Sequence, residues 1–259
     1  GKTTFNWASI NTPTPDLGPV AADKRVAFAA DFYLNKITGF SASKSSIAQP
    51  KLANIHDLGR GAIIAKYKQE VAGVEVFNRE YNIMMDREFN LVASSGYLAN
   101  KQSAKSLSSA IKNIPGEFGD SAKSITAAFK AMGGDTDSVA LTVKNASGKY
   151  DEFSVVSTAK DKLLVGAPRA KKVFFEHKNK LIPAHYVEIE TSTIDSVDSE
   201  YFSYVVSAKT GEVLFKKNLT SHAADFNYRV YADANGKPWD SPHGEVMPAP
   251  SDADPLAFL

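Results

Sequence analysis

Cysteine is absent from the 259 residues of this chain. Without it the chain can form no disulfide, offers no thiol nucleophile and holds no metal through thiolate. A dominant charge is also lacking, because 30 Lys and Arg residues stand against 29 Asp and Glu residues. A formal net charge of +1 gives no strong field towards nucleic acid or an anionic membrane, so neither is expected as a partner.

Long apolar runs and familiar catalytic motifs are missing too. No stretch approaches the roughly 20 apolar residues of a membrane span. A zinc protease needs His-Glu-x-x-His, which places two imidazoles on one face of a helix. None of the five histidines belongs to such a motif; they are His56, His177, His185, His222 and His243. We therefore expect no catalytic residue, no metal ligand and no cofactor in this chain.

A dispersed metal site is the alternative that would make the chain an enzyme. Its candidate ligands are His177, His185 and Glu188. The segment around them reads as a strand, and residues three apart on a strand point to opposite faces. We therefore favour solvated or hydrogen-bonded hairpin residues over a metal site.

The most regular stretch is 61–98, which predicts three antiparallel strands. Ile63, Ala65 and Tyr67 alternate with polar neighbours, as one face of a strand requires. Ala72-Gly73 then interrupts the pattern where a reversal belongs. The apolar phase of the second strand changes partway, which predicts a β-bulge near Phe77-Asn78.

A helix is predicted before these strands and another before a second group of strands. The first begins at Asp23 as N-cap and runs to about Thr38, and it would cover the apolar face of the strands. The second is capped by Asp120 or Ser121 and runs to Met132. Hairpins are expected at 139–157, 171–190 and 201–218, whereas 1–22 is read as an extended arm and 41–57 as a polar connection. This order predicts an α+β fold of two cystatin-like units, each an antiparallel sheet curled around one helix.

Residues 67–98 resemble the FTP domain, the propeptide module of fungalysin- and thermolysin-type metalloproteases. Tyr67, Gln69, Gly73, Val74 and Val76 match the aromatic-x-Gln strand and the Gly-Val-x-Val turn of that family. The match continues through Phe77, Asp86, Val92, Ser94 and Gly96.

Two later segments resemble parts of the same precursors. Thr210, Gly211 and Glu212 fit the Thr-Gly-Glu turn of the PepSY module, although Ala208 stands where that module commonly has Asp. Residues 223–244 resemble the first strand of a mature fungalysin-type (M36) protease.

The resemblance implies a propeptide that acts as intramolecular chaperone and cleft-blocking inhibitor of a secreted zinc metalloprotease. It implies an arm at 1–22, an FTP-like domain at 23–105, a PepSY-like domain at 106–220, and a linker with the start of the protease at 221–259. The partner would be the protease catalytic domain, which would hold zinc, with calcium as a further candidate. Ser221, His222 and Ala223 are the predicted cleavage junction, and His222 is a candidate contact to the zinc. A signal peptide would have been removed, and the protein would be secreted or periplasmic.

A free-standing binding module of the periplasm or cell exterior is the alternative from another class. A basic run lies beside an acidic run in the second half of the chain, and it reads either as a solvated face or as a charged contact to the protease. The basic residues are Lys162, Arg169, Lys171, Lys172, Lys178 and Lys180, and the acidic ones are Glu188, Glu190, Asp195, Asp198 and Glu200.

Overall fold

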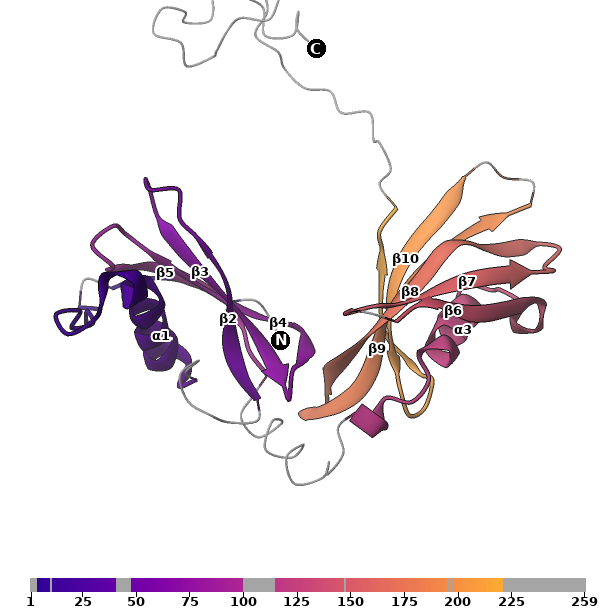
Figure 1. Cartoon of the computed structure of the whole chain (residues 1–259), viewed down its shortest axis with the longest axis horizontal. Helices are drawn as coiled ribbons and strands as arrows, with labels where there is room; N and C mark the ends of the chain where they lie inside the picture. Colours follow the sequence, from indigo (N-terminus) through magenta and orange to yellow (C-terminus); the bar gives the residue numbers. More distant parts are fainter. Residues whose placement is uncertain are drawn as a thin grey trace, which may run out of the picture. The chain divides into compact units, whose positions relative to one another are not determined.

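The computed structural model describes residues 4–9, 11–40, 48–99, 115–146, 148–194, 196 and 198–220, and the side chains of all of these except 48 and 115 (Figure 1). The described residues belong to one compact unit, Gly1–Thr220. No helix within these ranges is long and apolar enough to span a membrane.

Five strands form the first part of the sheet. They are β1 (Thr4–Trp7), β2 (Ala48–His56), β3 (Ile63–Val71), β4 (Val74–Met85) and β5 (Leu91–Tyr97). Neighbours pair antiparallel in the order β2-β3-β4-β5-β1. The predicted three strands of 61–98 are confirmed, and Ile63, Ala65 and Tyr67 are all buried on one side of β3.

Helix α1 (Arg25–Thr38) packs against β3 and β4. Tyr33 and Leu34 on the helix meet Tyr67 and Ile83 on the strands in one hydrophobic cluster. The helix ends at Gly39, whose φ of 70° is left-handed and whose N–H donates to the Asn35 carbonyl. The predicted helix is confirmed but its N-cap is wrong, because a short 3-10 turn, η1 (Ala22–Lys24), precedes it and no side chain caps it.

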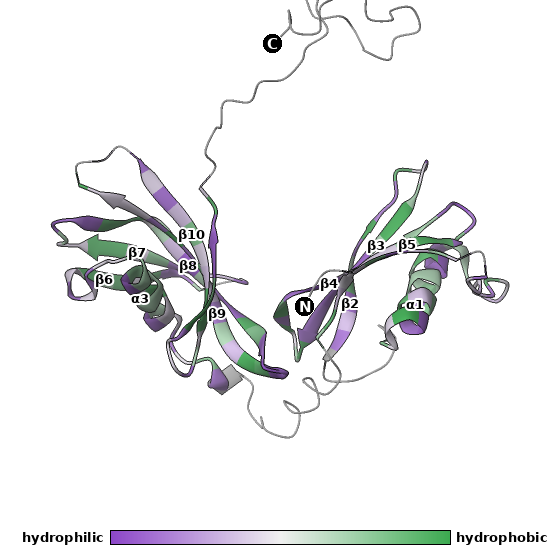
Figure 2. Ribbon diagram, turned by 180° about the vertical axis from the view of Figure 1, so that it is seen from behind, coloured by the Kyte–Doolittle hydropathy of each residue, from purple (hydrophilic) through white to green (hydrophobic). Residues whose placement is uncertain are grey.

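The second part of the sheet follows its own helix. It contains η2 (Pro115–Glu117), α3 (Ser121–Ala131), η3 (Thr136–Ser138), β6 (Val139–Asn145), β7 (Asp151–Ser157), β8 (Lys162–His177), β9 (Lys180–Thr193), β10 (Ser199–Ser207) and β11 (Val213–Asn218). The Asp120 carboxylate accepts a hydrogen bond from the Ala122 N–H at 2.9 Å, which confirms Asp120 as the N-cap. Ile125 and Phe129 of α3 pack over Val187 of β9. Hydrophobic and hydrophilic positions are interspersed along the strands (Figure 2).

Strand β4 joins the two parts. Its pairing with β3 jumps from Lys68↔Glu80 to Glu70↔Glu75, which confirms the predicted bulge, and Asn78 within it has a φ of 53°. At the bulge, Val76 pairs with Phe174 of β8 in parallel. All the strands in the described part of the chain therefore belong to one mixed sheet of eleven.

This continuity overturns the predicted fold class. The described strands do not form two separate cystatin-like units, each an antiparallel sheet around one helix. They form one large mixed sheet, on which α1 and α3 pack. Strand β5 pairs with β4 only from Glu80 onwards, so the preceding edge of β4 is open and β8 pairs with it. Periodicity predicts strands and their faces, but it does not predict which open edges meet.

Two further strands were not expected. β1 lies in the predicted arm, and β2 lies in the predicted polar connection at 41–57. The proposed domain boundaries after 22, 105 and 220 stay predictions. Residues 100–114 and 221–259 lie outside the described residues.

Candidate functional site: a charged and aromatic face of the sheet

The strands β8, β9 and β10 lie side by side, and α3 packs on one face of them. Ala170, Val187 and Tyr204 point towards this helix and are fully buried. Because side chains alternate along a strand, the residues next to them point to the opposite face. That face carries charged and aromatic side chains, and we call it the Glu188 face; its residues are Tyr150, Arg169, Lys171, Tyr186, Glu188 and Tyr201.

Glu188 lies at the centre of the face and is only 8% exposed. Its Oε2 accepts hydrogen bonds from Arg169 Nε at 2.6 Å and from the Tyr201 hydroxyl at 2.7 Å. Burial alone would raise the pKa of Glu188, but these hydrogen bonds outweigh it and hold the pKa below its usual value. Burial and the hydrogen bond to Glu188 raise the pKa of Tyr201 to about 12. Glu188 is therefore a fixed anion whose charge is compensated locally.

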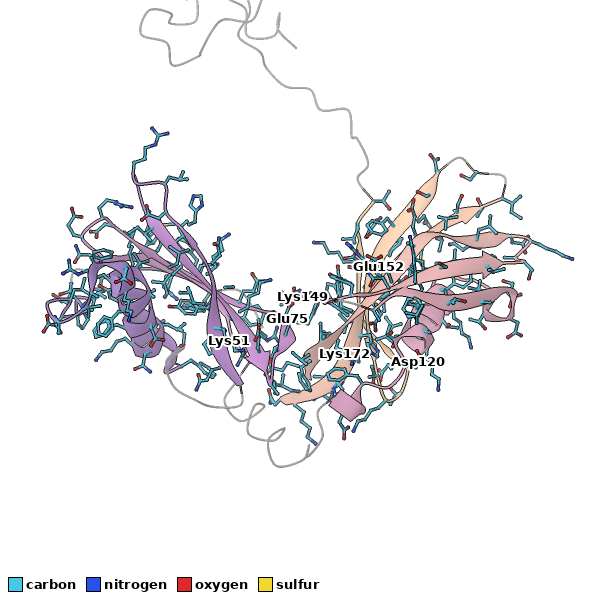
Figure 3. All side chains as sticks on the ribbon, viewed as in Figure 1. Lys51, Glu75, Asp120, Lys149, Glu152 and Lys172 are labelled. Carbon is cyan, nitrogen blue, oxygen red and sulfur yellow. The ribbon has the colours of Figure 1, made fainter. Side chains whose placement is uncertain are left out.

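Arg169 presents the most accessible charge of this group. Its side chain is 43% exposed, although Glu188 binds it and its guanidinium lies over the Tyr150 ring at 4.7 Å. The hydrogen bond to Glu188 raises the pKa of Arg169 further. Glu152 of β7 is its cross-strand neighbour, and it is labelled in Figure 3. An arginine held in this way keeps an accessible surface in a fixed geometry.

Lys171 connects this face to the junction with β4. Its ammonium is 2.9 Å from the carboxylate of Glu75 on β4 and lies 5.2 Å from the centre of the Tyr186 ring. Glu75 is labelled in Figure 3. Beside this pair, Phe77 packs its ring 5.6 Å from Tyr186. The face therefore extends without interruption from β10 to the bulge in β4.

A second ion pair connects β4 to β8 on the other side of the bulge. Arg79 of β4 contacts Glu176 of β8 at 2.7 Å, and the two side chains are only 10% and 15% exposed. The Arg79 guanidinium also lies over the Tyr97 ring at 4.3 Å. These contacts hold β4 against β8 although only one pair of residues forms the strand pairing.

The basic and acidic runs of the sequence pair with one another in part. Arg169 binds Glu188, and Lys162 binds Glu200 at 3.0 Å. The face is therefore a mosaic of both signs with aromatic rings between them. Such an arrangement suits recognition of another protein better than attraction of a strongly charged polymer.

The candidate metal ligands do not come together. His185 points towards α3, where its Nδ1 lies 2.8 Å from Ser124 Oγ, whereas Glu188 points to the opposite face. His177 lies at the end of β8 and is partly exposed. Across the described ranges, no three His, Asp or Glu side chains form a group that could hold a metal ion.

The residues that carry the FTP resemblance lie in the core or in turns of the sheet. Tyr67 and Val76 are fully buried, and Val74 packs in the same cluster as Val76. Gln69 Oε1 accepts a hydrogen bond from the Ala99 N–H at 2.7 Å, which fixes the chain after β5. Gly73 has a φ of 83° in the reversal between β3 and β4. Their meaning as family positions stays a prediction.

The PepSY-like turn joins β10 to β11. Thr210 Oγ1 accepts from the Glu212 N–H at 3.3 Å, and the Gly211 N–H donates to the Ser207 carbonyl at 2.9 Å. Gly211 has a φ of 71°, and Glu212 is exposed. The predicted cleavage junction at Ser221, His222 and Ala223 lies outside the described residues.

The aromatic and hydrogen-bonding partners on the Glu188 face were not predicted. The sequence indicates Arg169 and Glu188 as members of the two charged runs, but it gives no prediction for Tyr150, Tyr186 and Tyr201. The alternation along β9 and β10 was the available signal, because it assigns Tyr186, Glu188 and Tyr201 to the face opposite the apolar residues.

A polar cavity of about 450 Å³ lies elsewhere, beside η3. Its lining includes Asp135, Asp137 and Asp161, and Asp135 Oδ1 accepts from the Asp137 N–H at 3.1 Å. This carboxylate therefore caps the short helix η3.

No family model matches the chain, and no curated protein matches it. Among solved structures, one distant neighbour is the C-terminal domain of Bacillus megaterium YpeB, with a TM-score of 0.28 and 9% sequence identity over 78% of this chain. The chain spans 66% of that neighbour's length, slightly less than two thirds. A likeness this low carries no argument about fold or function.

Proposed function

We propose that the chain is the propeptide of a secreted zinc metalloprotease of the fungalysin type. In this role it would assist folding of the catalytic domain and block the substrate cleft until it is cut away. The order of the resembling segments supports the proposal: the FTP-like segment with Tyr67 and Gly73 comes first, the PepSY-like turn with Gly211 second, and the protease-like segment at 223–244 last. Zinc would belong to the protease, and this chain would supply the surface that covers it.

The Glu188 face is the observation that carries the proposal. An inhibitor must present a surface that does not need to be ordered on binding, because fixing mobile side chains reduces affinity. Here Glu188 and Tyr150 hold Arg169 in place, while 43% of its side chain stays exposed. Arginine and tyrosine are also among the residues that dominate binding energy at protein interfaces. We propose that this face contacts the catalytic domain.

Covalent linkage would make a modest affinity sufficient. A short tether gives an effective concentration on the order of 1 mM, so a complex with a Kd of ~1 μM stays closed. Interfaces of the usual size, roughly 1,600 Å², include complexes of this affinity. Cleavage at Ser221–Ala223 would remove the tether, and the propeptide could then dissociate.

The test uses the complete chain and the mature protease of the same precursor. We expect the precursor reading frame to continue past Leu259 into a His-Glu-x-x-His motif, and the chain to suppress peptide hydrolysis at micromolar concentration. A frame that ends without a zinc motif, or full activity at micromolar chain, would contradict the proposal. His222→Ala in the precursor tests the zinc contact separately, since unchanged latency would remove His222 from that role.

A free-standing binding module is the second candidate, and one observation favours it. Phe5 and Trp7 of β1 are 56% and 73% exposed, and their rings contact edge to face at 5.1 Å. Exposed aromatic pairs of this kind suit binding of another molecule. The reading frame decides between the two candidates, because this module requires no protease downstream.

A further inference from the structure

His185 is fully buried where α3 packs on the sheet. It lies in the middle of β9 with no exposed surface, and its Nδ1 is 2.8 Å from the hydroxyl of Ser124 on α3. The ring of Phe118 lies 6.1 Å away. Among the residues described, Nε2 has no hydrogen-bond partner. A neutral imidazole with its proton on Nδ1 fits this site, because Nδ1 can then donate to the Ser124 hydroxyl and Nε2 carries no proton that needs an acceptor.

Few charged groups face the ring, and none of the described ones binds it. Asp151 of β7 accepts instead from Ser121 Oγ at 2.8 Å, and Asp120 caps α3. Lys172 of β8 is the exposed cross-strand neighbour, and Val206 of β10 pairs with His185 on the other side. Glu117 of η2 is bound to Lys209.

Burial therefore decides the charge state of His185. It lowers the pKa to about 4; Asp151 and Asp120 oppose this shift, and Lys172 adds to it. A proton on the ring would place a second N–H donor and a full charge in a site that offers Nε2 no acceptor. The charge can be hydrated only if α3 moves away from β9.

We propose that His185 and Ser124 form an acid-sensitive contact, and that a proton on His185 releases α3 from the sheet. The pKa of His185 is near 6.5 when the helix is released and lower when the helix is packed. The stability that the neutral ring contributes to the packing of α3 is therefore fully present above about pH 6.5, and it is lost as the pH falls towards 4. The inference is independent of the proposed function, because helix release is a property of this chain alone.

Release of α3 would also affect the Glu188 face. Ile125 and Phe129 cover the reverse side of the strands that carry Glu188 and Tyr201. Loss of that packing would leave these strands without their apolar cover. Acid would in this way weaken any contact that the face makes.

Hydrogen exchange of the complete chain tests the inference, with NMR titration of its histidines. Corrected for the intrinsic rate, opening of the α3 amides should increase about 100-fold between pH 6.5 and pH 4. His185 should titrate well below 6. In His185→Gln the increase should largely disappear, whereas His56→Gln, at an exposed site on β2, should retain it.

Three results would overturn the inference. They are a His185 that titrates near 6.5 in the folded chain, equal protection of α3 at both pH values, and an unchanged pH dependence in His185→Gln. If that variant does not fold, the titration and the exchange of the unaltered chain decide the matter by themselves.

Discussion

Replacing Phe77 by alanine tests whether the bulge in β4 packs against the strands of the second part of the sheet. Phe77 is 8% exposed, and its ring lies 6.1 Å from Phe175, 5.6 Å from Tyr186 and 5.2 Å from Phe215. Removing a buried phenylalanine costs about 3–5 kcal/mol. We expect a loss of about 3 kcal/mol in the free energy of unfolding, at the lower end because Phe175 and Phe215 are themselves only partly buried.

Urea unfolding followed by circular dichroism measures this loss. A loss of about 3 kcal/mol corresponds to a fall in the urea midpoint of roughly 1 M for a protein of this size. The matched control is Phe28→Ala on α1, where the side chain is 46% exposed, and the loss there should stay below about 1 kcal/mol. If Phe77→Ala costs no more than Phe28→Ala, the bulge does not pack on β8 and β9, and the single eleven-stranded sheet is wrong.

Further substitutions test the turns, the helix cap and the charged face. Gly96→Ala should cost about 3 kcal/mol or more in thermal or urea unfolding, because Gly96 has a φ of 117° and a Cβ there would lie 2.2 Å from the Glu80 carbonyl oxygen. Gly211→Ala, with a φ of 71° and open space around it, should cost only about 1–2 kcal/mol, and equal losses would contradict this reasoning. Asp120→Ala should cost about 1 kcal/mol through loss of the α3 cap, and no measurable change would show that the cap contributes nothing. Glu188→Gln should cost about 2 kcal/mol at pH 7, and because the folded pKa is lowered, the difference from the unaltered chain should shrink as the pH falls below about 4.3; a difference that is constant down to pH 2 would refute the assignment of the charge.

Local structure was predictable wherever a pattern of short range determines it. The alternation at Ile63, Ala65 and Tyr67 predicts β3, and the change of phase near Phe77 predicts the bulge. Asp120 before an apolar stripe predicts the start of α3. The first backbone N–H groups of a helix have no partner within the helix, and the side-chain oxygen of Asp120 accepts from one of them.

Long-range pairing was not predictable in the same way. Glu75 and Lys171 are 96 residues apart, and Arg79 and Glu176 are 97 apart, so no spacing in the sequence connects them. The open edge of β4 exists only because β5 pairs from Glu80 onwards. Separate units were therefore expected where the strands form one sheet.

The Glu188 face was predictable in part. Alternation assigns His185 and Glu188 to opposite faces, which excludes them as joint metal ligands. The hydrogen bond from Tyr201 depends on the register between β9 and β10, and the stacking of Arg169 on Tyr150 depends on the turn before β7. Neither feature has a signature in a single strand.

Calorimetric titration of the mature protease with this chain tests the proposed role of the Glu188 face most directly. We expect a Kd near 1 μM for the unaltered chain and a Kd about tenfold higher for Arg169→Ala, which is typical when an arginine anchor is lost. Lys51→Ala, which removes an exposed ion pair with Glu70 on β2 and β3, should leave the Kd unchanged. Absence of binding by the unaltered chain, or equal affinities for folded Arg169→Ala and Lys51→Ala, would contradict docking through this face.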